Sequence, residues 1–174
     1  MQKLYSQLIG LPIFDEYSPV PITLVRDLLI DPENGKLLAF IVKNQRIIVP
    51  LDVIRLGSGL FIKDREHIVV MDDVLRVAQV AQQKTKIMGA RVITQHQKTY
   101  LGRVVDYEID SHSLTLSTLH VAKTYLFFRF QEKIIPFHAI VRINKETIIV
   151  KDARATLPLA EKEKTATAPS AYAA

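Results

Sequence analysis

The chain has 174 residues, 48% of them hydrophobic and 24% charged, which is the composition of an ordinary soluble globular protein. It contains no cysteine, which excludes disulfides, thiolate metal sites and a cysteine nucleophile, and which suits a reducing cytosol. The net charge of +5 is modest and lies mostly in the second half, so it fits either a solvated, mildly basic surface or an anionic partner.

The first 71 residues are expected to form β-strands joined by tight turns. Residues 25–30 and 37–42 are aliphatic runs that flank the segment 31–35, in which Asp-Pro and Asn-Gly favour a hairpin turn. Further strands are expected at 47–49, 53–56 and 60–62. This half therefore reads as a small sheet domain.

Residues 72–86 are expected to form a helical linker. Asp72 and Asp73 are candidates for its N-cap rather than for a metal-ligand pair. The apolar residues on one helix face are Val74, Val77, Ala78 and Ala81. The helix either closes the first sheet domain or packs between two domains.

Residues 87–152 repeat the order of the first half. The strands expected here are 102–110, 114–119, 125–130, 133–141 and 147–152. In register, Asp27 falls on Asp106, Asp31 on Asp110, Pro50 on Pro136 and Lys63-Asp64 on Lys151-Asp152. A repeat of this length indicates a duplicated domain rather than a solenoid.

Residues 153–174 differ in composition from the rest of the chain. They are rich in Ala, Thr, Ser, Pro, Glu and Lys, and they cannot bury enough apolar surface to offset the entropy of ordering the chain. We expect a disordered tail.

The two half-repeats resemble PRC-barrel domains. The resemblance rests on Gly102, Val104, Asp106 and Asp110 in the second copy, and on Asp27, Asp31, the turn 31–35, Pro50 and Pro136 for the rest of the pattern. The first copy departs from it, because Thr23 stands near the position of the glycine. The family includes the cytoplasmic barrel of the photosynthetic reaction-centre H subunit and the C-terminal barrel of the ribosome maturation factor RimM. The resemblance implies small, strongly bent β-barrels that act in assembly and protein contacts, and it implies no catalytic residues.

Residues that could carry chemistry have structural interpretations as well. Asp27, Asp31, Asp106 and Asp110 could act as paired carboxylates in acid–base catalysis, or they could accept hydrogen bonds from turn amides. His112 and His120 could hold a metal by their spacing, or they could be solvated turn and strand residues. The chain has no glycine-rich phosphate loop and no Gly-x-Ser-x-Gly nucleophile elbow.

The aromatic run at 125–130 is the candidate partner surface. If it is one strand, alternation places Tyr125, Phe127 and Arg129 on one face, near Lys123. Aromatic residues beside an arginine suit a protein interface or the stacking of bases. The alternative is a strand that is buried on both faces.

The sequence therefore predicts an all-β protein with two tandem PRC-type barrels, at 1–71 and 87–152, joined by a short helix at 72–86 and followed by a disordered tail. We expect a cytoplasmic, non-catalytic adaptor or assembly protein for a protein partner, without cofactor, metal or transmembrane segment. Membrane-complex or photosynthetic assembly and peripheral membrane association stay open. The alternative is an RNA- or ribosome-associated maturation factor, with an enzyme third.

Overall fold

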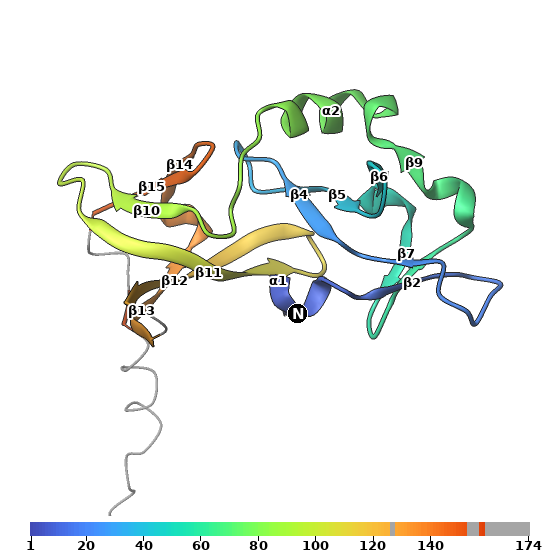
Figure 1. Cartoon of the computed structure of the whole chain (residues 1–174), viewed down its shortest axis with the longest axis horizontal. Helices are drawn as coiled ribbons and strands as arrows, with labels where there is room; N and C mark the ends of the chain where they lie inside the picture. The colour runs from blue at the N-terminus through green and yellow to red at the C-terminus, as the bar shows by residue number, and fades with distance from the viewer. Residues whose placement is uncertain (126–127, 153–156, 159–174) are drawn as a thin grey trace, which may run out of the picture.

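β-Strands arranged in three sheets are the main secondary structure of the chain. The computed structural model describes residues 1–125, 128–152 and 157–158. Two short α-helices and several single 3₁₀ turns complete this part of the chain (Figure 1). The protein is an all-β protein, as the strand patterns predict.

The first half of the chain forms two four-stranded sheets. One has the order β3-β2-β8-β7 and the other the order β4-β5-β6-β9. The strands are β2 Pro12–Asp15, β3 Thr23–Leu24, β4 Asp27–Ile30, β5 Leu37–Ile41, β6 Arg46–Ile48, β7 Val53–Leu56, β8 Leu60–Ile62 and β9 Val69–Val70. The predicted hairpins β4–β5 and β7–β8 are both present.

The second half forms one eight-stranded sheet, in which β1 from the start of the chain pairs with β11. The remaining order is β14-β15-β10-β11-β12-β13-β16. The strands are β1 Gln2–Leu4, β10 Arg91–Thr94, β11 Tyr100–Asp110, β12 Thr115–Tyr125, β13 Phe128–Pro136, β14 Ile140–Ile143, β15 Thr147–Val150 and β16 Leu157–Pro158. Apart from β16, the predicted tail lies outside the described residues.

The strand pairings of the first half recur in the second. The parallel pair β2–β8, extended by β7, corresponds to the parallel pair β10–β15, extended by β14. The run β4-β5-β6-β9 corresponds to β11-β12-β13-β16, and β3 and β4 together occupy the place of the long strand β11. The expectation of closed barrels is wrong, because within the described residues each sheet ends in edge strands.

The register between the halves differs from the predicted one after the third strand. Ile48 pairs with Phe40, whereas Ile135 pairs with Leu119, so Ile48 corresponds to Ile135. Pro50 then corresponds to Phe137 and not to Pro136. Pro50 and Phe137 each begin a 3₁₀ turn, whereas Pro136 ends the strand before that turn. Proline lacks an N–H group and is tolerated at both positions.

Helix α2, Leu75–Gln82, covers the outer face of the β4-β5-β6 sheet (Figure 1). Its Val77 and Val80 side chains are buried against Leu29, Ala39 and Ile47. The helix thus belongs to the first half, one of the two predicted alternatives. The expectation of an aspartate N-cap is wrong, because Val74 is the N-cap residue, and Asp72 and Asp73 lie in a preceding 3₁₀ turn.

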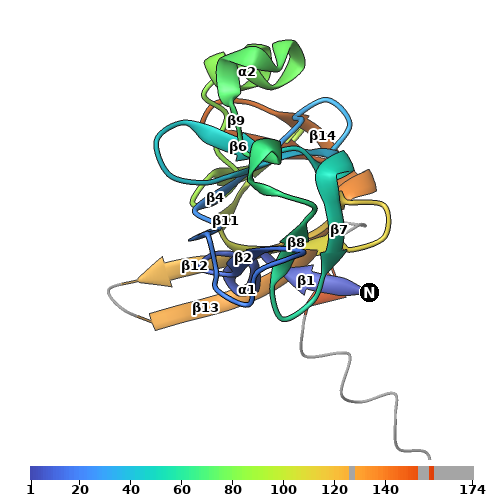
Figure 2. The ribbon, with the colours of Figure 1, turned by 90° about the vertical axis from the view of Figure 1, so that its right-hand side faces the viewer.

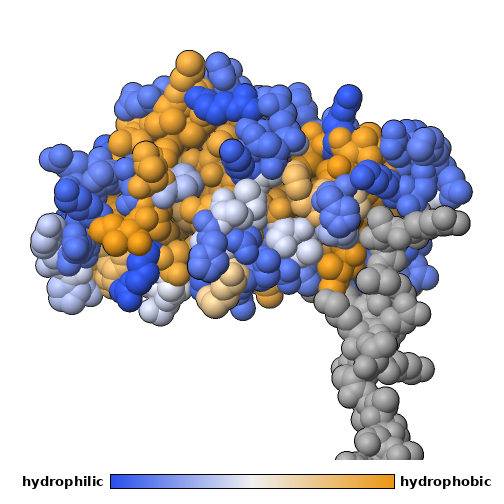
Figure 3. Space-filling view, turned by 180° about the vertical axis from the view of Figure 1, so that it is seen from behind, coloured by the Kyte–Doolittle hydropathy of each residue, from blue (hydrophilic) through white to orange (hydrophobic). Residues whose placement is uncertain are grey.

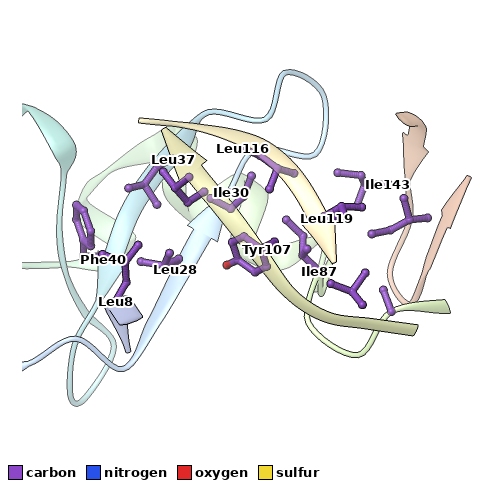
Figure 4. Packing of buried hydrophobic residues seen from close by; sticks show 14 of the residues in the cluster. Leu8, Leu28, Ile30, Leu37, Phe40, Ile87, Tyr107, Leu116, Leu119 and Ile143 are labelled. Carbon is purple, nitrogen blue, oxygen red and sulfur yellow. The ribbon is translucent and has the colours of Figure 1, made fainter. Parts of the chain in front are cut away.

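The two halves share one hydrophobic core. Leu8, Leu28 and Phe40 of the first half belong to the same cluster of buried residues as Tyr107 and Leu119 of the second (Figure 4). Helix α1, Tyr5–Leu8, packs against β11. The halves therefore form one packed body rather than two separate cores.

Backbone hydrogen bonds also cross between the halves. Leu37 donates to the carbonyl of Leu114 at 2.8 Å, and Leu116 donates to the carbonyl of Gly35 at 2.8 Å. These bonds flank a bridge between Lys36 and Thr115, which lie at equivalent positions of the two repeats. In the end-on view of Figure 2, the β12–β13 hairpin projects to one side of the sheets. The halves thus meet across a pseudo-twofold axis.

No helix among the described residues is long and apolar enough to cross a membrane.

Candidate functional site

The predicted aromatic surface does not lie on a single strand. Tyr125 ends β12, Arg129 lies in β13, and the register pairs Tyr125 with Phe128 and Thr124 with Arg129. The assumed alternation from 125 to 130 is therefore wrong, because the segment spans the end of a hairpin. Lys123 is half-buried on β12. Phe127 and the side chains of Tyr125 and Arg129 lie outside the described residues, so their role as a partner surface stays a prediction.

A better-defined surface lies along β7, an edge strand of the β3-β2-β8-β7 sheet. Ile54 is 56% exposed and sits in a β-bulge, and Leu51, in the 3₁₀ turn just before the strand, is 94% exposed. Edge strands keep one row of backbone N–H and C=O groups that the sheet does not use. Strand β7 therefore combines unused backbone hydrogen-bonding groups with exposed aliphatic side chains.

An open hollow of about 650 Å³ adjoins β7. Its lining comes from the loop after β2, which contributes Tyr17 and Pro19, and from Ile54, Arg55 and Phe61 of the β7–β8 hairpin. Tyr17 is 77% exposed. Large exposed aromatic and aliphatic residues around a hollow are typical of interaction sites.

Aromatic packing fixes the floor of this hollow. The Phe61 ring stacks on Phe14 with ring centroids 5.2 Å apart, and the Arg55 guanidinium lies 4.0 Å from the Phe61 ring centroid. Gly59 permits this arrangement, because a β-carbon there would lie 2.7 Å from the Phe14 ring. The guanidinium is thus held at the surface by a cation–π contact instead of pointing freely into water.

Strand β14 of the second half presents a related edge. Its sequence Ile-Val-Arg-Ile parallels Val-Ile-Arg-Leu in β7, and it is also the terminal strand of its sheet. Val141 occupies the bulge position of Ile54 and is 44% exposed, and Arg142 follows it as Arg55 follows Ile54. Figure 1 shows β7 and β14 at opposite ends of the molecule.

Apolar side chains gather on the face opposite to the view of Figure 1. Figure 3 shows that most of them lie over the half that carries α2 and β7. Figure 2 places β7 on this same side of the molecule. The repeated aliphatic-Arg pattern of β7 and β14 is the sequence signal for this surface. Their aliphatic residues alone would predict buried strands.

The four aspartates serve as hydrogen-bond acceptors for local amides. Asp31 accepts from the Glu33 amide, and Asp110 accepts from the amides of His112 and Ser113. The Ser113 and His112 amides lower the pKa of Asp110 to about 2. Asp27 and Asp106 each accept from the amide of the next residue. The turn interpretation is confirmed for Asp31 and Asp110.

Among the described contacts, His120 and His96 each lie beside one carboxylate, of Glu108 and Asp152, and His67 lies between those of Asp52 and Asp64. The Nε2 atom of His120 lies 3.2 Å from Glu108 Oε1, and the Nδ1 atom of His67 lies 3.0 Å from Asp52 Oδ1. The structure therefore pairs His120 with Glu108 on the neighbouring strand. Within the described ranges, His, Asp and Glu side chains nowhere form a group of three or more that could hold a metal ion.

Comparison with known proteins gives one family. Residues 1–75 match the sequence model of the PRC-barrel domain, a range that contains Asp27, Asp31 and the whole β7 edge. No curated protein matches the chain.

Proposed function

We propose that this chain, whose first 75 residues are a PRC-barrel domain, is a non-catalytic adaptor that binds protein partners through the exposed edge of that domain. The observation that carries the proposal is the β7 edge, where Ile54 and Leu51 are exposed beside an ordered arginine and an open hollow. An extended protein segment that adds to β7 as a further strand would use its free backbone groups and cover its aliphatic side chains.

We further propose that the second half is a second PRC-type unit and offers an equivalent edge. The recurrence of the strand pairings and of the bulged aliphatic-Arg pattern at β14 supports this. Because the two edges lie at opposite ends of the molecule, an adaptor of this kind would bridge two partner segments rather than bind one twice (Figure 1). Cytoplasmic location, assembly of a membrane or photosynthetic complex, and the identity of the partner stay predictions.

The test is affinity capture from native lysate with tagged full-length protein, with and without nuclease, comparing the wild type with Ile54→Lys. Leu75→Lys is the matched control, since Leu75 is 74% exposed on α2 and lies on neither edge. We expect the same captured proteins with and without nuclease, at least tenfold less capture by Ile54→Lys, and no loss with Leu75→Lys. Amide hydrogen exchange with the captured partner should then show protection of the β7 amides.

Two results would contradict the adaptor proposal. Loss of the captured proteins after nuclease would favour the RNA- or ribosome-associated alternative, whose electrostatic binding should also weaken steeply with salt. Equal capture by wild type and Ile54→Lys would remove β7 as the binding edge.

A further inference from the structure

A small pocket lies where the two halves of the chain meet. Its volume is about 210 Å³, larger than the roughly 150 Å³ that holds a benzene molecule in an engineered protein cavity. Tyr5 and the β4 strand line it from the first half, and the segment 85–88 and Tyr107 line it from the second. Its walls include the apolar side chains of Leu28, Ile30, Ile87, Met88 and Ile143.

The Asp27 carboxylate at this pocket uses only one of its oxygens. Asp27 Oδ1 accepts hydrogen bonds from the Tyr5 hydroxyl at 2.9 Å and from the Leu28 amide at 2.8 Å. Asp27 is exposed, and within the part of the chain that the structure describes its Oδ2 accepts no hydrogen bond from the protein. An ionised carboxylate can accept about four hydrogen bonds, so Oδ2 retains its capacity for a ligand.

Asp106, the equivalent carboxylate of the second half, shows which kind of donor would bond to the second oxygen. Asp106 Oδ2 accepts from the Ser6 hydroxyl at 2.6 Å, and its Oδ1 accepts from the Ser6 amide at 3.2 Å. Gly10 donates to the Val25 carbonyl as Gly89 does to that of Val104, and in this register Thr85 corresponds to Ser6. Thr85 lines the pocket, but among the described contacts it donates nothing to Asp27. The pocket therefore lies where the pseudo-symmetry leaves a solvent-facing carboxylate oxygen without a protein donor.

Two tyrosines complete the polar part of the pocket. The rings of Tyr5 and Tyr107 lie 4.8 Å apart, and Tyr107 is only 2% exposed. The Tyr107 hydroxyl points toward Leu28 and Leu8 in Figure 4, and it makes no hydrogen bond to any described residue. Among the described residues, no fully buried side-chain polar atom lacks a partner, so the Tyr107 hydroxyl is not fully buried, and Tyr107 is one of the residues that line the pocket.

The pocket carries one acidic and one basic side chain: Asp27 lies beside the two tyrosines, and Lys86 lies on the exposed rim. Burial raises the pKa of Tyr5, and the charge of Asp27 raises it further. Burial also raises the pKa of Tyr107, with added contributions from Tyr5 and Asp27. Both phenols therefore stay neutral, and the Asp27 carboxylate together with two aromatic rings favours a cation over an anion at this end of the pocket.

We propose that this pocket binds a small primary ammonium compound with a short apolar body. The ammonium donates to Asp27 Oδ2 and lies against the tyrosine rings, and the apolar body contacts Leu28 and Ile87. Lys86 lies on the exposed rim of the pocket, where its charge can pair with a carboxylate carried by the same ligand. The ligand class is thus a simple alkylamine or a free apolar amino acid, which share the ammonium and the apolar body.

Titration calorimetry and ¹H–¹⁵N chemical-shift mapping of the full chain test the proposal with 3-methylbutylamine, its neutral analogue 3-methylbutan-1-ol, and L-leucine. We expect the amine to bind at least tenfold more tightly than the alcohol, with shifts centred on Leu28, Ile87 and Tyr107. Asp27→Asn, which keeps the shape of the side chain, should weaken amine binding at least tenfold. Asp106→Asn is the matched control and should bind as the wild type does, with thermal melts verifying that both variants fold.

The leucine experiment separates the two sources of the ammonium group. If leucine binds more tightly than the amine and this advantage disappears in Lys86→Met, the pocket is assigned to amino acids. If leucine binds more weakly than the amine, the pocket is assigned to simple amines. The proposal is overturned if neither 3-methylbutylamine nor L-leucine binds, or if the alcohol binds as well as the amine. It is also overturned if Asp106→Asn weakens amine binding as much as Asp27→Asn does. The pocket proposal is independent of the adaptor proposal, because Ile54 and Leu75, the two positions substituted in the adaptor test, do not line this pocket.

Discussion

Gly102 shows how one residue adapts a repeated pattern to two surroundings. Its φ angle is +139°, and a β-carbon there would lie 2.4 Å from the carbonyl oxygen of Ala122 on β12. The corresponding residue of the first half is Thr23, since Thr23 pairs with Ile13 as Gly102 pairs with Val92. The neighbouring strand β5 ends at Ile41, before the position that corresponds to Ala122. The glycine is therefore present in the half where the neighbouring strand extends past this position, and absent in the half where it ends earlier.

Gly102→Ala should lower the free energy of unfolding by about 2–4 kcal/mol, because a backbone clash and an unfavourable φ add to one another. Gly57→Ala is the control, since its β-carbon would have no neighbour within 4 Å, and it should change stability by less than about 0.5 kcal/mol. Urea unfolding followed by circular dichroism measures both. Equal stability of Gly102→Ala and the wild type would show that β12 can move away from this site.

At the scale of a single element, helix α2 is held mainly by two valines. Val77 and Val80 are almost fully buried against the outer face of the first sheet, whereas Leu75 on the same helix is 74% exposed. An eight-residue helix is too short to be stable alone in water, so its packing face decides whether it forms. The helix also places Arg76 2.7 Å from Asp31, whose side chain is almost fully buried in the β4–β5 turn.

Val80→Ala should destabilise the protein by about 2 kcal/mol, through the lost burial of two methyl groups and the cavity that they leave. Leu75→Ala, the matched exposed position, should cost less than about 0.5 kcal/mol. Urea denaturation gives both values. If the two substitutions cost the same, α2 is not anchored through its valine face.

At the scale of the whole molecule, the repeated halves behave as parts of one core. Strand β1 at the start of the chain pairs with β11, and the Ser6 hydroxyl donates a hydrogen bond to Asp106, a hundred residues away. The ring of Phe137 covers Gly35 so closely that a β-carbon there would lie 2.6 Å from it. Each half thus supplies part of the other's packing.

We therefore expect one cooperative unfolding transition for the full chain. In native-state hydrogen exchange, the buried amides of Phe40 and Leu119 should open with free energies that agree within about 1 kcal/mol, because neither half loses its structure alone. A first half that exchanges as a unit at clearly lower free energy than the second would show two independent domains.

The sequence by itself determined the all-β class, the hairpin turns with their aspartate caps, the PRC-barrel resemblance of the first half and most strand positions. These features are local: alternation has a period of two residues, and turn chemistry acts over two to four. Only the tertiary structure decided that the aromatic run at 125–130 spans a hairpin end, that β7 and β14 are edges, and that Tyr5 meets Tyr107 beside Asp27. Those outcomes depend on contacts between residues tens to a hundred positions apart, and no short-range pattern in the chain encodes which strand is left at an edge.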